Sequence, residues 1–123
     1  MAANAVIAIV DDDDLVRASL ASLFRSFGVR AEAFSSAASL LSGDLDRFDV
    51  IVSDLQMPGF NGLELRRKLS EREVSLPVII ITAYPERAID SSRADKGLHL
   101  LEKPVDSAQL INCIEKVLGR SIS

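Results

Sequence analysis

The sequence has little of several features that mark particular protein classes. It has one cysteine in 123 residues, Cys113, so no disulfide can form within the chain and nothing indicates an oxidising compartment. We interpret Cys113 as a small buried hydrophobe. Basic residues are not in excess: the net charge is -4, which argues against nucleic-acid binding because a duplex requires a basic surface.

Long apolar runs and linkers are lacking too. The apolar run at residues 5–10 is too short for a signal peptide or a membrane span, and no basic residue precedes it. We therefore expect a cytoplasmic protein without membrane attachment. No repeat or Pro/Gly/Ser-rich linker divides the chain, and 48% hydrophobic with 26% charged residues is ordinary globular composition. One domain over residues 1–123 is expected.

Short apolar runs alternate with segments of helical periodicity. Continuous apolar runs predict strands that are covered on both faces, as in a parallel sheet; they occupy residues 5–10, 50–52, 77–82 and 98–101. Residues 30–34 alternate and predict an edge strand. Helical periodicity follows each run, and Gly28 is placed to stop the first helix. Five strands alternating with five helices predict an α/β fold, a doubly wound parallel sheet of strand order 2-1-3-4-5.

Polar residues mark where the helices should begin. Asn61 and Asp106 are each followed three residues later by Glu or Gln, which is capping-box spacing. Ser35 or Ser36 is placed to cap a short helix. A proline in the first turn predicts a further helix over residues 85–94.

Chemically active side chains stand where the predicted strands end. Four aspartates at residues 11–14 follow the first strand, Asp54 ends the third, Thr82 ends the fourth, and Lys103 follows the fifth. Ligands of doubly wound sheets bind beyond the carboxyl ends of the strands, at the switch point between strands 1 and 3. We therefore expect these side chains to converge.

The converging carboxylates indicate a cation site. Asp11, Asp12 and Asp54 would repel one another, and a hard divalent ion with oxygen ligands relieves this repulsion. Mg2+ suits a few carboxylates together with water and a phosphate oxygen. The simpler interpretation, a helix cap, is kept for Asp13 or Asp14.

An ionised carboxylate at Asp54 can attack phosphorus and form an acyl phosphate. Lys103 would supply charge for phosphoryl oxygens and Thr82 a hydroxyl donor. Taken alone, Asp54 could be a turn residue, Lys103 a solvated lysine and Thr82 a strand terminus. The functional interpretation rests on their occurrence together at several strand ends. The single histidine, His99, is a conceivable phosphoryl acceptor, but its place within a strand favours a packing or surface role.

The segments that carry these residues resemble the response-regulator receiver domain of two-component signalling, most of all its FixJ-type subfamily. They are IAIVDDDDLVR at 7–17, VIVSDLQMPG at 50–59 with Gly62, IIITA at 79–83 and LEKP at 101–104. The resemblance covers essentially the whole chain in order. It implies the flavodoxin-like (βα)5 receiver fold.

The resemblance also implies roles at individual positions. Asp54 matches the phosphoacceptor and contributes to the metal site. Asp12 matches a direct Mg2+ ligand, Asp11 a partner that acts largely through water, and the backbone carbonyl of Gln56 a further ligand.

Other matched positions concern signalling. Thr82 matches the hydroxyl that moves to the phosphoryl group, and Lys103 the lysine that pairs with it, with a cis bond to Pro104. The family usually places an aromatic switch residue where this chain has Leu100. Tyr84 lies nearby in sequence and could contribute instead.

The implied function is a phosphoacceptor switch of a two-component phosphorelay. A sensor histidine kinase or a phosphotransfer protein would deliver the phosphoryl group to Asp54 in a Mg2+-dependent reaction, and the face of helix 4, strand 5 and helix 5 would change. The domain would be regulatory rather than an enzyme, would assist its own phosphorylation and dephosphorylation, and could form a homodimer on phosphorylation. It could precede a helix-turn-helix domain in a longer transcription regulator.

Two alternatives remain open. The chain could be a phosphorylation-independent interaction module with a receiver fold, which Leu100 and the polar helix at 85–94 favour. It could also be a Mg2+-dependent phosphohydrolase with an aspartyl nucleophile, because Asp11 and Asp13 have the required spacing. The second alternative would leave Asp54 and Lys103 unexplained.

Overall fold

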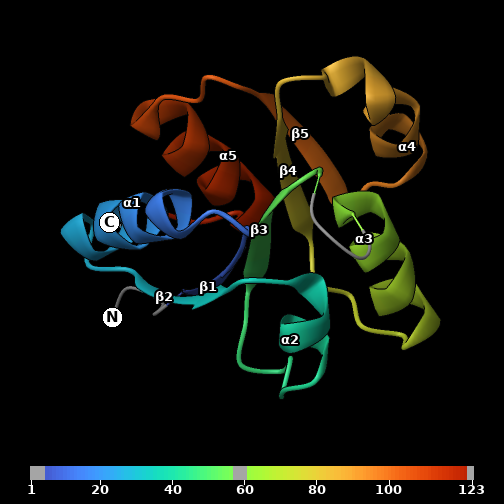
Figure 1. Ribbon diagram of the computed structural model, residues 1–123, viewed down its shortest axis with the longest axis horizontal. Helices are drawn as coiled ribbons and strands as arrows, with labels where there is room; N and C mark the ends of the chain where they lie inside the picture. The colour runs from blue at the N-terminus through green and yellow to red at the C-terminus, as the bar shows by residue number, and fades with distance from the viewer. Residues whose placement is uncertain (1–4, 57–60, 122–123) are drawn as a thin grey trace.

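The computed structural model describes residues 5–56 and 61–121. Their strands form one parallel sheet of order β2-β1-β3-β4-β5, so the predicted order is confirmed (Figure 1). The strands are β1 (Val6–Val10), β2 (Arg30–Phe34), β3 (Val50–Asp54), β4 (Val78–Thr82) and β5 (Leu98–Glu102). Apolar side chains make β1, β3 and β4 almost wholly buried. β2 lies at the edge of the sheet, as predicted, and is more exposed, although its exposure does not alternate strictly.

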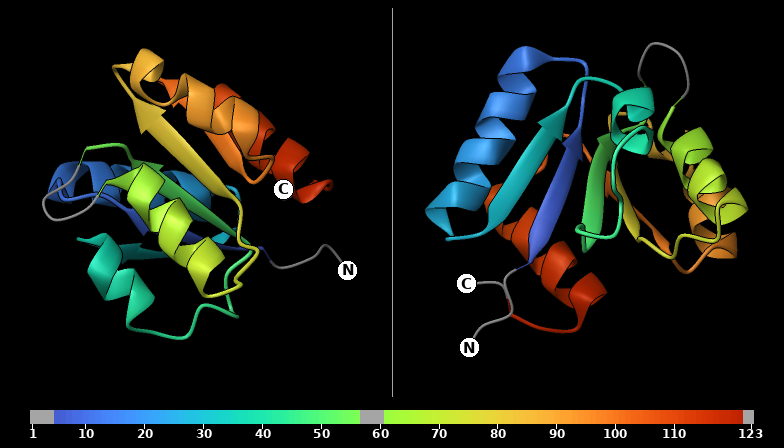
Figure 2. Two further views of the ribbon diagram at one scale, coloured as in Figure 1. Left: turned by 90° about the vertical axis from the view of Figure 1, so that its right-hand side faces the viewer. Right: turned by 90° about the horizontal axis from the view of Figure 1, so that it is seen from below.

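Helices cover both faces of the sheet (Figure 2). They are α1 (Asp14–Ser26), α2 (Ala37–Leu41), α3 (Gly62–Glu71), the 3-10 helix η1 (Pro85–Arg87), α4 (Ile89–Ala94) and α5 (Ser107–Leu118). One hydrophobic layer lies between the sheet and α2 and α3. The other lies between the sheet and α1 and α5. Cys113 of α5 packs against this second layer as a small hydrophobe, as expected, but it is only half-buried.

The helix starts are capped as the sequence predicts. Capping boxes are present at Asn61 and at Asp106. Of the cap residues that the sequence offered, Asp13 caps α1 and Ser36 caps α2. Each side chain accepts at least one backbone N–H group from the first turn of its helix. Gly28 follows the end of α1 with a φ of 72°, a left-handed conformation that glycine adopts without strain. Because the helices begin and end at these residues, the carboxyl ends of the parallel strands lie at one edge of the sheet. The polar residues that follow the strands lie at the same edge.

The predicted helix over residues 85–94 is wrong as a single element. The chain first makes the 3-10 turn η1, in which the Arg87 N–H donates to the Tyr84 carbonyl at 3.1 Å and the Ala88 N–H to the Pro85 carbonyl at 3.0 Å. The α-helix α4 starts only after Ala88, which is buried in the layer shared with α2 and α3. Burial of Ala88 and weak helix propensity around Asp90 explain the break.

None of the helices in the described part of the chain is both long enough and apolar enough to cross a membrane.

Candidate functional site

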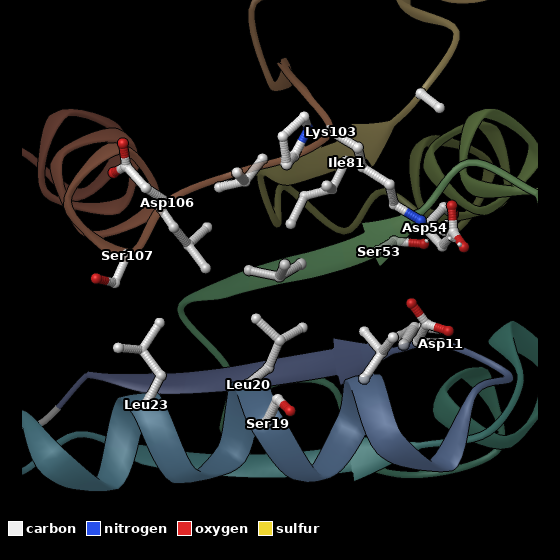
Figure 3. Close-up of a pocket in the computed structure, with 17 residues that line it drawn as sticks. Asp11, Ser19, Leu20, Leu23, Ser53, Asp54, Ile81, Lys103, Asp106 and Ser107 are labelled. Carbon is white, nitrogen blue, oxygen red and sulfur yellow. Dashed lines mark hydrogen bonds and ion pairs between the residues drawn. The ribbon is translucent and has the colours of Figure 1, made fainter.

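The carboxyl ends of β1 and β3 bring three aspartates together, of which Figure 3 shows Asp11 and Asp54. Val10 of β1 is in register with Ser53 of β3, which sets Asp11 beside Asp54. Asp11, Asp12 and Asp54 each present a carboxylate oxygen, and these oxygens lie within 4.8 Å of one another. The predicted convergence of these three residues is therefore present in the fold.

Asp11 is the most firmly held member of this group. Its side chain accepts the Asp13 N–H at 2.9 Å, its own N–H donates to the Phe34 carbonyl at 3.1 Å, and the residue is 4% exposed. Burial raises the pKa of Asp11; the Asp13 N–H opposes this, and the charge of Asp54 adds to it. A buried carboxylate beside other carboxylates is stabilised by a cation. Hard oxygen donors at this spacing fit Mg2+.

Arg17 is a neighbour that sequence reasoning missed. Its Nη1 donates to the Asp11 carbonyl at 2.6 Å, and its Nη2 pairs with the Asp14 carboxylate. This guanidinium ties the start of α1 to the loop that carries Asp11. The three-residue spacing of Asp14 and Arg17 was the available signal, since such pairs meet on a helix.

Asp54, at the end of β3, faces a lysine that directly follows β5 at the same edge of the sheet. Lys103 Nζ lies 3.4 Å from Asp54 Oδ2, and Figure 3 shows this side chain reaching down to Asp54. The Lys103 N–H donates to the Thr82 carbonyl at 2.8 Å, which fixes the lysine at the end of β4. The expected cis bond between Lys103 and Pro104 is present.

Beyond Asp54 the chain enters the loop to α3. The Gln56 N–H lies 3.4 Å from Asp54 Oδ1, and the predicted contribution of the Gln56 carbonyl to a metal site stays a prediction. Met57, Pro58 and Gly59 of the matched motif lie outside the described residues.

Thr82 is buried at the end of β4, and its hydroxyl oxygen accepts the Tyr84 N–H at 3.0 Å. Tyr84 is 49% exposed, and the guanidinium of Arg87 lies 4.8 Å from the centre of its ring. Thr82 is therefore linked directly to the turn that precedes η1.

Leu100 and His99 lie further back along β5. Leu100 is in register with Ile80 and packs against the layer beneath α2 and α3. His99 is in register with Ile79 and half-buried, and burial lowers its pKa. Since Ile79 comes three residues before the end of β4 at Thr82, His99 stands back from the edge that carries the carboxylates.

Asp13 is not part of the carboxylate group formed by Asp11, Asp12 and Asp54. Its Oδ1 accepts the N–H groups of Leu15 and Val16 at 2.8 and 3.2 Å, as a helix cap does. A phosphohydrolase that uses Asp11 as nucleophile and Asp13 as acid would need this capping carboxylate at the reacting centre. The geometry disfavours that alternative.

Known proteins resemble this chain along nearly all of its length. The family model for the response regulator receiver domain matches residues 7–115. Transcriptional regulatory protein FixJ of Azorhizobium caulinodans is 40% identical over 116 residues, which cover 92% of this chain and 54% of that protein. Nodulation protein W of Bradyrhizobium diazoefficiens is 32% identical over 114 residues, which cover 90% of this chain and 50% of that protein. The chain thus spans about half the length of these relatives.

Solved structures agree with the sequence comparisons. A crystal structure of FixJ-N superposes with a TM-score of 0.84 at 29% identity and covers 98% of each chain. The response regulator StyR superposes with a TM-score of 0.82 at 31% identity, over 95% of this chain and 60% of that one.

Proposed function

Because this chain belongs to the response regulator receiver domain family of two-component signalling, we propose that it is a phosphoacceptor switch in which Asp54 takes the phosphoryl group. The observation that carries this proposal is the setting of Asp54. Its carboxylate lies within 4.8 Å of those of Asp11 and Asp12, and 3.4 Å from Lys103 Nζ. A turn aspartate would need none of these neighbours.

The donor would be phosphohistidine on a sensor histidine kinase or a phosphotransfer protein. An ionised Asp54 oxygen attacks the phosphorus in line as the phosphorus–nitrogen bond breaks, and the electron pair leaves with the imidazole, which takes up a proton. The Lys103 ammonium, already at Asp54, pairs with a phosphoryl oxygen and holds the transferred charge. The Thr82 hydroxyl donates to another phosphoryl oxygen once it turns toward Asp54.

Asp11, Asp12, Asp54 and the Gln56 carbonyl would hold Mg2+. The resemblance implies direct contact for Asp12, which is exposed, and contact largely through water for Asp11, which is buried. When bound, Mg2+ neutralises negative charge on the phosphoryl oxygens. Asp11 is kept in place by the Asp13 N–H and by Arg17.

The relay outward runs through the turn after β4. If the Thr82 hydroxyl turns to a phosphoryl oxygen, the Tyr84 N–H loses the acceptor that it has at 3.0 Å. The turn then rearranges, and η1 and α4 follow it. This route needs no aromatic ring at Leu100. It would alter the face of α4, β5 and α5, where a second copy of the chain could bind.

The test is phosphorylation by acetyl phosphate, measured as a mass gain on the intact protein. We expect one phosphoryl group per chain with Mg2+, little without it, and none on Asp54→Asn. The exposed Asp46→Asn is the matched control and should label normally. Full Mg2+-dependent labelling of Asp54→Asn would refute the proposed acceptor.

A phosphorylation-independent interaction module is the second candidate. Leu100 in place of an aromatic residue and the six-residue α4 favour it. A stable phosphoryl mimic such as beryllofluoride decides between the two, by sedimentation for oligomeric state and by titration of a binding partner for affinity. A change in either supports the switch, and no change in both supports the module.

The longer relatives suggest the wider setting. Transcriptional regulatory protein FixJ is about twice the length of the matched segment. We propose that residues 1–123 are a single receiver domain of a cytoplasmic regulator. A further domain, such as a helix-turn-helix, would then contact DNA, because the receiver itself is acidic.

A further inference from the structure

A crevice of about 780 Å3 lies between α1 and α5, over the faces of β3 and β4 (Figure 3). Its apolar lining includes Val16, Leu20 and Leu23 of α1, Ile81 of β4, Val105 in the loop before α5, and Leu110 of α5. It runs along the sheet and ends at the candidate site, where Asp11 and Asp54 also line it. Cavities of this size with mostly apolar walls and a few polar groups are typical of small-molecule sites.

The crevice is open because α1 and α5 do not close over the sheet. Val16, Leu20 and Leu23 share the inner face of α1, yet each keeps part of its surface exposed. Among the residues of α1, all of which the structure describes, Phe24 alone is buried. Apolar surface that is left within a concave site favours an apolar ligand.

The charge at the crevice indicates the sign of that ligand. Among the described residues that line it, Asp11, Asp54 and Asp106 are acidic and Lys103 is basic. Lys103 lies 3.4 Å from Asp54, so three carboxylates along the crevice share a single ammonium group. Ser53, in the same wall, donates its hydroxyl to the Asp54 carbonyl at 2.8 Å. A cationic head group therefore suits the end of the crevice at Asp11 and Asp54.

We propose that this crevice binds a small amphipathic organic cation, an alkylammonium or arylalkylammonium compound. The ammonium lies against Asp11 and Asp54, and the hydrocarbon lies among Leu20, Leu23 and Leu110. Binding itself does not depend on the proposed function. Its consequence does: the ammonium would occupy carboxylates that Mg2+ needs, so the ligand would compete with Mg2+ and suppress phosphorylation of Asp54.

Hexylammonium is a suitable probe, with methylammonium and 1-hexanol as controls for its head and its tail. Binding is followed by nuclear magnetic resonance on the isotopically labelled chain. We expect shifts at Leu20, Ile81 and Leu110, and affinity at least about tenfold higher than for either control, because each buried methylene strengthens binding by roughly fourfold. Mg2+ should weaken hexylammonium binding. Equal affinity for 1-hexanol would overturn the proposal, since the crevice would then be an apolar surface for a partner protein.

A matched pair of variants tests the location. Ser19 lines the crevice, whereas Ser22, on the same helix, does not. Both are exposed, so Ser19→Phe and Ser22→Phe should fold alike. We expect Ser19→Phe to weaken hexylammonium binding at least about fivefold by filling the crevice, and Ser22→Phe to leave it unchanged. Unchanged binding to Ser19→Phe would place the ligand elsewhere and overturn the proposal.

The two proposals fail separately. Normal labelling of Asp54 by acetyl phosphate without hexylammonium binding would overturn this inference alone. Hexylammonium binding to a chain that acetyl phosphate does not label would overturn the proposed function alone.

Discussion

The β1–β3 end and the β4–β5 end of the same sheet edge are held in different ways. At the first end, Asp11 is fixed by the Asp13 N–H, by the Phe34 carbonyl and by Arg17, and it is 4% exposed. At the second, a 3-10 turn and a short helix follow β4, and Tyr84 and Ile89 are 49% and 38% exposed. The two ends therefore suit different roles. Carboxylates that bind an ion, as proposed for the β1–β3 end, benefit from a fixed geometry. A relay, as proposed for the β4–β5 end, needs a segment that can move.

The far end of α4 is fixed again. Arg66 of α3 makes a two-point ion pair with Asp95, with Nε–Oδ2 at 2.8 Å and Nη2–Oδ1 at 3.1 Å, and its Nη1 donates to the Leu76 carbonyl. Arg66 lowers the pKa of Asp95 through this hydrogen bond. The segment that we propose as the relay is therefore bounded by Thr82 on one side and by Asp95 on the other.

Removing the Thr82 hydroxyl should abolish the coupling between phosphorylation at Asp54 and the turn that follows β4. In Thr82→Val the Tyr84 N–H has no hydroxyl acceptor before or after phosphorylation, so we expect the turn to stop responding. The measurement is the change in the amide spectrum of residues 84–94 on adding beryllofluoride with Mg2+. Thr82→Ser keeps a hydroxyl and should retain the response. A wild-type response in Thr82→Val would contradict the relay.

Loosening the fixed end of α4 should mainly lower stability. A Cβ at Gly97 would clash with the Arg66 guanidinium, so Gly97→Ala must shift this group and should weaken its pair with Asp95. We expect a loss of about 1–3 kcal/mol in the free energy of unfolding, measured with urea. At Gly43 the nearest atom would be 3.8 Å away, so Gly43→Ala is the control and should cost far less. Equal losses would show that the ion pair does not depend on Gly97.

The fixed carboxylate should reduce stability at neutral pH when Mg2+ is absent. Burial raises the pKa of Asp11 above the ordinary value of an aspartate, so the folded chain binds this proton more tightly than the unfolded chain. Stability should therefore rise as pH falls through the folded pKa. Asp11→Asn keeps an acceptor for the Asp13 N–H and should be more stable than the wild type at pH 7. The gain should shrink as the pH falls through the folded pKa of Asp11, and a gain that does not shrink would have another cause.

The sequence was sufficient for features that depend on local patterns. Apolar runs located the strands, right-handed crossovers predicted helices on both faces, and the doubly wound fold usual at this size supplied the strand order. Because parallel strands end at one edge, the sequence also predicted that Asp11, Asp12 and Asp54 would meet. Capping-box spacing located the starts of α3 and α5.

Features that depend on tertiary contacts escaped the sequence analysis. The break between η1 and α4 depends on the burial of Ala88, which no periodicity marks. The Arg66–Asp95 pair joins residues that are 29 positions apart. The crevice exists because α1 and α5 diverge over the sheet, and helix periodicity does not report how two helices lie relative to each other.

Mapping the phosphoryl group on the wild-type chain tests the central claim most directly. After reaction with acetyl phosphate and Mg2+, borohydride reduces an acyl phosphate to an alcohol, and peptide mass spectrometry then locates the modified residue. We expect the modification at Asp54 and its loss when Mg2+ is removed. Modification at Asp11 or Asp12 instead, or no modification of an aspartate at all, would contradict the account.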